Sequence, residues 1–259
     1  MATLTRTLQQ NSWLIYGALF VALTILLVFS PAEATLGNVV KIVYAHGAAE
    51  RVATYAYLIA GGLGLAHVSL RAFLRFRSGQ VFAKQSPTRD AETPALACGA
   101  SVASSHPSAR SAHSGSLLTM TETLARWAQA TGETAIVFWL AQFVISAPAQ
   151  VLAWGAFTLS EPRVASALVV LIATALVYVV ARWLGDPTWM SLAAIANAAI
   201  LVIVLHGAIN ILHPVDPIVG SDSPAIKIFY VAIVVVTGLV AAQCVRERER
   251  NSNGNTERI

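Results

Sequence analysis

Six long apolar stretches with almost no charged residues run through this chain, and they constrain its fold more than any other feature. Each stretch has about 20 residues, the length at which a helix crosses the hydrocarbon core of a bilayer. Charged residues make up only 12% of the 259 residues and apolar residues 56%. Soluble domains carry about 25% charged residues. We therefore expect an all-α, polytopic membrane protein with about six transmembrane helices.

The expected spans can be placed from the apolar runs. Pro148 should bend or end the third span, because proline has no amide hydrogen to donate inside a helix. The first run could be a signal peptide, since Ala32-Glu33-Ala34 resembles a cleavage site, but about 17 apolar residues exceed the usual length of about 7–15, so a retained span is favoured. The expected spans are 13–29, 52–74, 131–152, 164–183, 190–209 and 226–245.

Lysine and arginine are divided unevenly between the two sides of these spans. Of the 17 basic residues, Lys41, Arg51, Arg163 and Lys227 fall on one side, and the remaining thirteen fall on the side of the N-terminus. Cytoplasmic loops are enriched in Lys and Arg. The bias predicts an N-in, C-in, multi-pass protein of the cell (plasma or inner) membrane, surrounded by membrane lipid. The net charge of +4 therefore indicates no nucleic-acid partner.

The chain divides into four regions. Residues 1–77 hold spans one and two with a first external loop, and residues 121–245 hold spans three to six with two more. Residues 78–120 are rich in Ser, Ala, Pro, Thr and Gly without an apolar period, which predicts a disordered cytoplasmic linker. His106 and His113 lie there and are expected to be solvated. Residues 246–259 form a cytoplasmic tail, whose alternating Arg and Glu indicate a solvated helix end.

Two histidines lie at the external ends of spans, on the same side of the membrane. His46 precedes span two and His213 follows span five. Two neutral imidazoles that face each other can ligate a haem iron from both sides of the porphyrin. A histidine at a membrane interface can also be an ordinary hydrogen-bonded surface residue. Both readings stay open on these residues alone.

Basic and aromatic residues accompany the two histidines in the external segments. Lys41, Arg51 and Arg163 could pair with the propionates of a haem. Trp154 and Phe157 could form an aromatic platform at the level of the lipid headgroups. Trp154 could equally be a membrane anchor, and Lys41 and Arg51 could simply mark the end of span two. The residues thus indicate a six-span protein with a candidate external metal or haem site.

Together the three external segments resemble the CcmC (haem exporter protein C) family of cytochrome c maturation proteins. Residues 41–46 (Lys-Ile-Val-Tyr-Ala-His) are similar to the family's stretch before its first haem ligand, and residues 210–213 (Asn-Ile-Leu-His) to its second ligand stretch. Trp154-Gly155 and Glu161-Pro162-Arg163 stand where the family's tryptophan-rich loop begins and ends. Most of that loop's tryptophans are replaced, with Phe157 at one position, and Ala208 and Ile209 replace a tryptophan pair.

The resemblance implies a haem-binding role in cytochrome c biogenesis. Haem b would be held non-covalently at the outer face, with His46 and His213 as axial ligands of the iron. It would then pass to a haem chaperone of the CcmE type, with ABC-type maturation subunits of the CcmA/CcmB type as further partners. The protein would be no enzyme and would have no catalytic residues. The implied haem contacts besides the two histidines are Trp154, Phe157, Arg163, Lys41 and Arg51.

Two other functions remain open. A small membrane transporter or channel would explain polar residues inside apolar spans, which are costly unless functional. Hydrogen bonds between helices are the alternative explanation for such residues. An intramembrane b-haem electron carrier would use His67 and His206, although we expect His206 to form an interhelical hydrogen bond. The polar residues concerned are Glu133, Gln142, Asn197 and His206.

The expected orientation predicts which sites are reachable from outside the cell. Single cysteines at Ser160 and Asp216 should react with a membrane-impermeant thiol reagent in intact cells. A cysteine at Ser104 should react only after the membrane is permeabilised. Labelling at Ser104 together with protection at Ser160 would reverse the orientation.

Overall fold

The computed structural model describes residues 12–33, 36–84, 109–208, 218 and 221–256. All six of the helices in these residues are long and apolar enough to cross a membrane. No strand occurs in the described part of the chain, so the expected all-α, polytopic membrane fold is confirmed. The helices are α2 (Ser12–Phe29), α3 (Val40–Lys84), α4 (Ala109–Trp154), α5 (Pro162–Leu184), α6 (Pro187–Gly207) and α7 (Pro224–Thr256).

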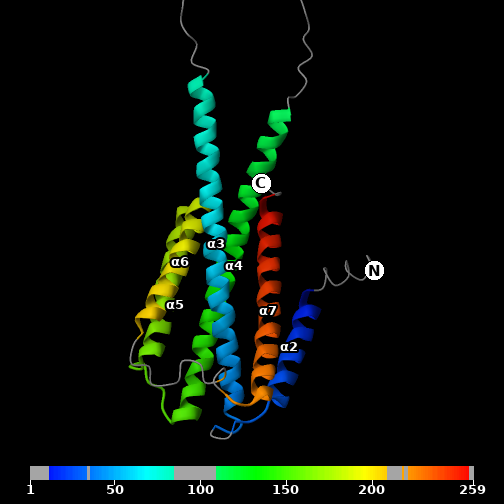
Figure 1. Cartoon of the computed structure of the whole chain (residues 1–259), viewed down its shortest axis with the longest axis vertical. Helices are drawn as coiled ribbons and strands as arrows, with labels where there is room; N and C mark the ends of the chain where they lie inside the picture. The colour runs from blue at the N-terminus through cyan, green and yellow to red at the C-terminus, as the bar shows by residue number, and fades with distance from the viewer. Residues whose placement is uncertain (1–11, 34–35, 85–108, 209–217, 219–220, 257–259) are drawn as a thin grey trace, which may run out of the picture.

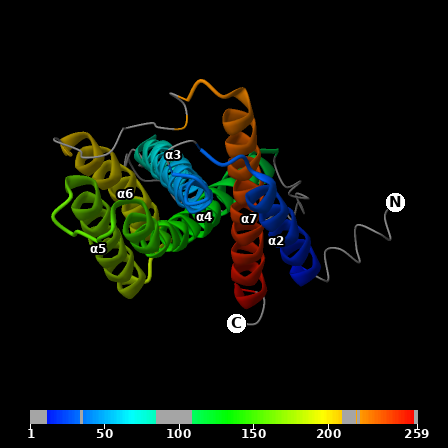
Figure 2. The same ribbon diagram turned by 90° about the horizontal axis from the view of Figure 1, so that it is seen from below.

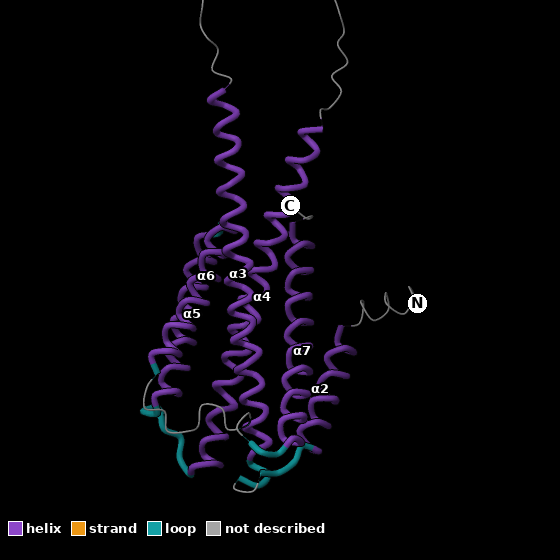
Figure 3. Tube along the Cα trace, in the orientation of Figure 1, coloured by secondary structure: helices purple, strands orange, loops and turns teal. Residues whose placement is uncertain are grey.

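The helices run up and down in one elongated bundle. Helices α3 and α4 lie at its centre, α5 and α6 on one side, and α7 and α2 on the other (Figures 1 and 2). Helices α3, α5 and α7 begin at the end of the bundle where α2, α4 and α6 finish, and the loops after α2 and α4 lie there (Figure 3). We call this the His46 end, because His46 lies in the second turn of α3. The opposite end is the C-terminal end.

The helical hairpin of α5 and α6 shows how local sequence sets helix ends. Glu161 caps α5 by accepting a hydrogen bond from Val164 N at 2.8 Å, and a proline follows it at the first helical position. Gly185 ends α5 in the left-handed conformation, with φ 74°, which glycine adopts without steric cost. Asp186 then caps α6 by accepting from Thr188 N at 2.6 Å. These signals give the tight turn between the two helices.

Asp186 also joins this turn to the central helix α3. Its carboxylate pairs with Arg71 at 3.5 Å, and Arg71 also donates to the Thr188 hydroxyl. Hydrogen bonds from Thr188, helped by the nearby Arg71 charge, hold the pKa of Asp186 below its usual value. The cap therefore stays ionised at neutral pH.

Small residues let α3 and α6 approach closely. A Cβ atom on Gly64 would stand 2.5 Å from the Ser191 carbonyl oxygen, and one on Gly61 would stand 2.6 Å from Ala198 Cβ. Such backbone contact is the usual means by which helices associate where lipid removes the hydrophobic drive between them. The contact places α6 against the middle of α3.

Polar side chains inside the bundle bond from helix to helix. Tyr57 of α3 and Thr174 of α5 share a hydrogen bond of 2.9 Å, and Asn197 of α6 donates to the Thr174 carbonyl at 3.3 Å. Glu133 of α4 accepts from Tyr178 of α5 at 2.7 Å and from Arg248 of α7 at 2.6 Å. Glu133 and Asn197 thus have interhelical partners.

Three boundaries differ from those expected. Helix α3 begins at Val40, so the stretch before Arg51, expected as a loop, is helical. Helix α4 includes Pro148 and ends at Trp154, close to the expected end at 152. We expected a disordered linker over 78–120, but α3 runs to Lys84 and α4 starts at Ala109; residues 85–108, with His106, lie outside the described residues. A helix grows by one hydrogen bond per residue once started, so polar extensions form without an apolar period.

The charged tail of α7 is a helix end with Arg246 and Arg250 exposed, as expected, but the residues between them contact other helices. Helix α7 continues to Thr256, and three consecutive residues of it bond to other helices. Glu247 accepts from Tyr16 of α2 at 2.9 Å, Arg248 pairs with Glu133, and Glu249 lies 3.5 Å from Arg126 of α4. The alternating charges of the tail thus meet hydrogen-bonding or oppositely charged side chains on neighbouring helices. The sequence of one helix does not reveal such partners.

The contact between α3 and α6 predicts a difference between two neighbouring glycines. Gly64→Ala should destabilise the protein by about 1–3 kcal/mol, because the new methyl group must displace backbone. Gly62→Ala is the matched control, since a Cβ there meets nothing within 4 Å. Thermal unfolding in detergent, followed by loss of the monodisperse peak on size exclusion, measures both. Equal midpoints for the two variants would contradict the close approach.

Candidate functional site

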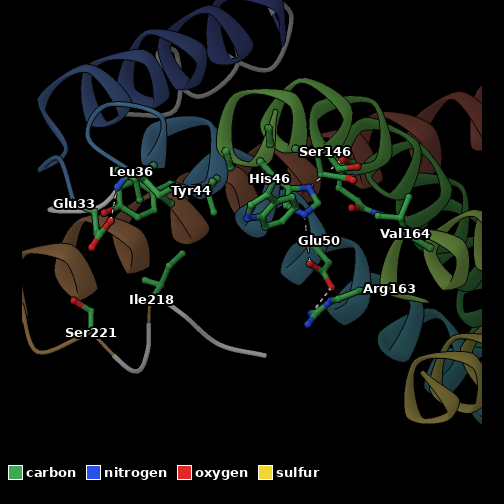
Figure 4. A pocket seen from close by; sticks show the side chains of 18 of the residues that line it. Glu33, Leu36, Tyr44, His46, Glu50, Ser146, Arg163, Val164, Ile218 and Ser221 are labelled. Atoms are coloured by element: carbon green, nitrogen blue, oxygen red, sulfur yellow. Dashed lines mark hydrogen bonds and ion pairs between the residues drawn. The ribbon is translucent and has the colours of Figure 1, made fainter. Parts of the chain in front are cut away.

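A cavity of about 560 Å³ opens at the His46 end of the bundle. Its walls come from α3, α4 and α5, from Leu205 of α6 and Ile226 of α7, and from the segments before α3 and before α7 (Figure 4). This volume falls within the range of about 300–1,000 Å³ typical of sites for small molecules and cofactors. Most of the lining is apolar. The polar lining residues are Glu33, His46, Glu50, Gln142, Ser146, Gln150, Arg163, Ser221 and Asp222.

His46 is held by a backbone group of the neighbouring helix. Its Nδ1 lies 3.1 Å from the carbonyl oxygen of Gln142 in α4. A carbonyl oxygen only accepts, so Nδ1 carries the proton and donates it; this tautomer follows from the hydrogen bond. In the neutral ring, Nε2 therefore keeps its lone pair. His46 lines the cavity, with its side chain 23% exposed.

Glu50 and Arg163 form an ion pair beside His46. Glu50 lies one turn after His46 on the same face of α3, and Arg163 is the second residue of α5. Arg163 Nη2 donates to Glu50 Oε1 at 3.0 Å, and Glu50 Oε2 lies 4.0 Å from His46 Nε2 (Figure 4). The Glu50 and Arg163 side chains are 18% and 23% exposed. The pair joins α3 to α5 at the wall of the cavity.

The structure brings Trp154 to the same cavity but leaves Phe157 apart from it. Trp154 is the last residue of α4, lines the cavity and keeps 57% of its surface exposed. Gly155 then turns the chain with φ 80°. Phe157 lies in the following loop, is 38% exposed and is absent from the described lining. An aromatic contact at the cavity therefore comes from Trp154.

Lys41 and Arg51 also lie away from the described lining of the cavity. Lys41 Nζ donates to the Val28 carbonyl at 2.6 Å, which satisfies an oxygen at the end of α2. Arg51 is half-buried and follows His46 by five residues, which turns it about 140° around α3. Of the three cations expected near a haem, the structure places Arg163 at the cavity.

His213 lies outside the described residues, within 209–217. The described residues on both sides of that segment border the cavity, since Leu205 and Ile218 both line it. Because His213 itself is outside the described residues, the second proposed iron ligand stays a sequence prediction.

Several lining residues were not among those expected at a haem site. Gln142, Ser146 and Gln150 repeat every four residues along α4 and are all buried. That spacing puts them on one helix face, a signal that could have been found in the sequence. Gln142 Nε2 has no hydrogen-bond partner among the described residues. Glu50 could also have been found, because it stands four residues after His46.

The described residues contain no group of three or more His, Cys, Asp or Glu side chains that could hold a metal ion. A lone histidine with an open nitrogen suits a metal that brings its own ligands, as haem does. Comparisons with protein-family models, curated proteins and solved structures found no match for this chain. The fold and cavity define it as an all-α membrane protein, with six bilayer-length helices in its described residues and a candidate ligand site at one end of the bundle.

Proposed function

We propose that this protein holds haem b in the cavity at its His46 end and presents it to a haem chaperone during cytochrome c biogenesis. The observation that carries the proposal is the state of His46. Its Nδ1–H donates to the Gln142 carbonyl, and its Nε2 lone pair is free for a metal. Histidines that bind metals almost always donate their other ring N–H to a carbonyl, a carboxylate or water. His46 has this arrangement beside a mainly apolar cavity.

Other residues of the cavity fit the parts of a haem molecule. His46 would ligate the iron, and His213 would supply the second axial ligand. Arg163 offers a guanidinium for a propionate, the pairing for which arginine is best shaped. Trp154 offers an aromatic surface for the porphyrin edge. Lys41, Arg51 and Phe157 lie outside the described lining of the cavity.

The transfer step rests on the resemblance to the CcmC family. It implies a chaperone of the CcmE type as acceptor and ABC-type subunits of the CcmA/CcmB type as partners in releasing it. Trp154 is exposed and lies at the end of α4, where a water-soluble partner protein could reach a ligand in the cavity. Haem supplies the redox-active iron; the chain's own residues bind it, orient it and screen it from water.

An intramembrane electron carrier with His67 and His206 as ligands does not fit the geometry. His67 shares a hydrogen bond of 2.7 Å with Ser191 of α6. His206 follows Ser191 by 15 residues in the same helix, a rise of about 22 Å. One iron cannot join side chains so far apart. His206 is exposed and bonds to Val202 O of its own helix at 2.9 Å, so the interhelical bond expected for it is wrong.

Most of the polar residues that favoured a transporter have hydrogen-bond partners that explain their presence in apolar spans. Glu133 and Asn197 bond to other helices, and His206 bonds within its own. Gln142 remains, and it lines the same cavity as His46. The described polar residues therefore favour one ligand site at the His46 end over a path through the bundle.

The proposal predicts distinct spectra for three histidine variants of the purified full chain. After reconstitution with haem, the parent should show a Soret band and the split α and β bands of a bis-histidine complex. His46→Ala and His213→Ala should each lose or shift these bands, because each removes an axial ligand. His206→Ala is the matched control and should keep the parent spectrum. Absorbance spectra of the oxidised and reduced proteins measure this.

Two results would overturn the assignment. Loss of the haem bands in His206→Ala with no change in His46→Ala would move the site away from the cavity. A parent protein that binds no haem after reconstitution would favour a transporter with another ligand.

A further inference from the structure

Among the described residues, Arg163 is the only arginine or lysine that lines the cavity. Its guanidinium is already occupied, because it donates to Glu50 Oε1 at 3.0 Å. Both side chains are mostly buried, which makes such a charge-assisted contact stronger than an exposed pair. A ligand carboxylate that binds Arg163 must therefore compete with Glu50.

Glu50 also stands beside the nitrogen that would bind iron. Its second oxygen, Oε2, lies 4.0 Å from His46 Nε2. A haem held through Nε2 would need the space beside that nitrogen, where this carboxylate lies. One side chain thus binds the cation and also stands beside the metal-binding nitrogen (Figure 4).

We propose that Glu50 is an internal competitor that stands in for the carboxylate of the ligand and sets the affinity of the cavity. The inference rests on the proposed function and names a determinant of ligand affinity at the same site. A ligand with its own carboxylate displaces Glu50 from Arg163, and Glu50 then turns away from His46. Glu50 thereby keeps binding reversible, as transfer to a chaperone requires.

The direction in which Glu50→Gln changes the affinity for a carboxylate ligand distinguishes a competing role of Glu50 from a supporting one. If Glu50 competes, Glu50→Gln weakens the hold on Arg163 and strengthens binding of a carboxylate ligand. If Glu50 merely holds Arg163 in position, the same change weakens binding. Glutamine keeps the size of the side chain and removes its charge, so packing at the wall of the cavity is preserved.

The test is a titration of the full-length protein in detergent with haem and with haem dimethyl ester, whose two carboxylates are masked. Glu50→Gln should bind haem about tenfold more tightly than the parent, since it removes a charged competitor. Its gain for the ester should be much smaller, because the ester does not pair with Arg163. Glu50→Ala should also bind haem more tightly than the parent, so the test remains possible if one of the two variants fails to fold.

Glu33→Gln is the matched control for charge. Glu33 lines the same cavity but lies at the opposite end from Arg163 (Figure 4), where its carboxylate accepts from Leu36 N at 2.8 Å. This variant removes one negative charge from the cavity and leaves the Glu50–Arg163 pair intact. Haem affinity should change by less than about twofold, because a screened, distant charge contributes little. Adding Arg163→Gln to Glu50→Gln should erase the gain specific to haem.

Several outcomes would overturn the inference while leaving the proposed function standing. These are weaker haem binding by Glu50→Gln, an equal gain for haem and its ester, and an equal gain in Glu33→Gln. A parent protein that binds neither haem nor its ester is a different result, since it removes the proposed function and the inference together.

Discussion

In the hydrocarbon core of a bilayer, no water is available to bond with backbone N–H and C=O groups, so the chain must satisfy them itself. Six continuous helices meet this requirement here. The same rule explains why polar loops and helix caps lie at the ends of the bundle. Helix α3, with 45 residues, is about 67 Å long, more than twice the roughly 30 Å of the hydrocarbon core. Part of α3 therefore extends beyond the lipid, and Figure 1 shows it reaching past α5 and α6 at the C-terminal end of the bundle.

Burial of charge in such a bundle needs partners on neighbouring helices. Glu133 has Tyr178 and Arg248, and the consecutive residues 247–249 of α7 reach α2 and α4. These contacts tie the C-terminal end of the bundle together. At the His46 end the corresponding contact is the pair of Glu50 and Arg163, which leaves a cavity beside it. Ion pairs join helices at both ends, and the His46 end also holds the candidate site.

The candidate site is assembled from helix ends, and this affects what it can do. His46 stands on a continuous helix, and a carbonyl of α4 orients its ring, so its free nitrogen has a defined direction. Arg163 follows the Glu161 cap of α5, which fixes where its side chain begins. Side chains on rigid elements are positioned more accurately than side chains on loops. The side chains of His46 and Arg163 therefore start from well-defined positions at the wall of the cavity.

Apolar runs of bilayer length and the absence of charge within them determined the fold class and the approximate spans, because both are properties of consecutive residues. The histidine, arginine and tryptophan of the site were also visible in the sequence, through His46, Arg163 and Trp154. Tertiary structure alone decided that these three line one cavity, that Lys41 and Arg51 do not border it in the described residues, and that Glu50 holds Arg163. Those facts depend on how the faces of separate helices meet, and residues far apart in the chain carry no local signal of that meeting. The charged end of α7 shows the same limit, since its partners on α2 and α4 are more than 100 residues away in sequence.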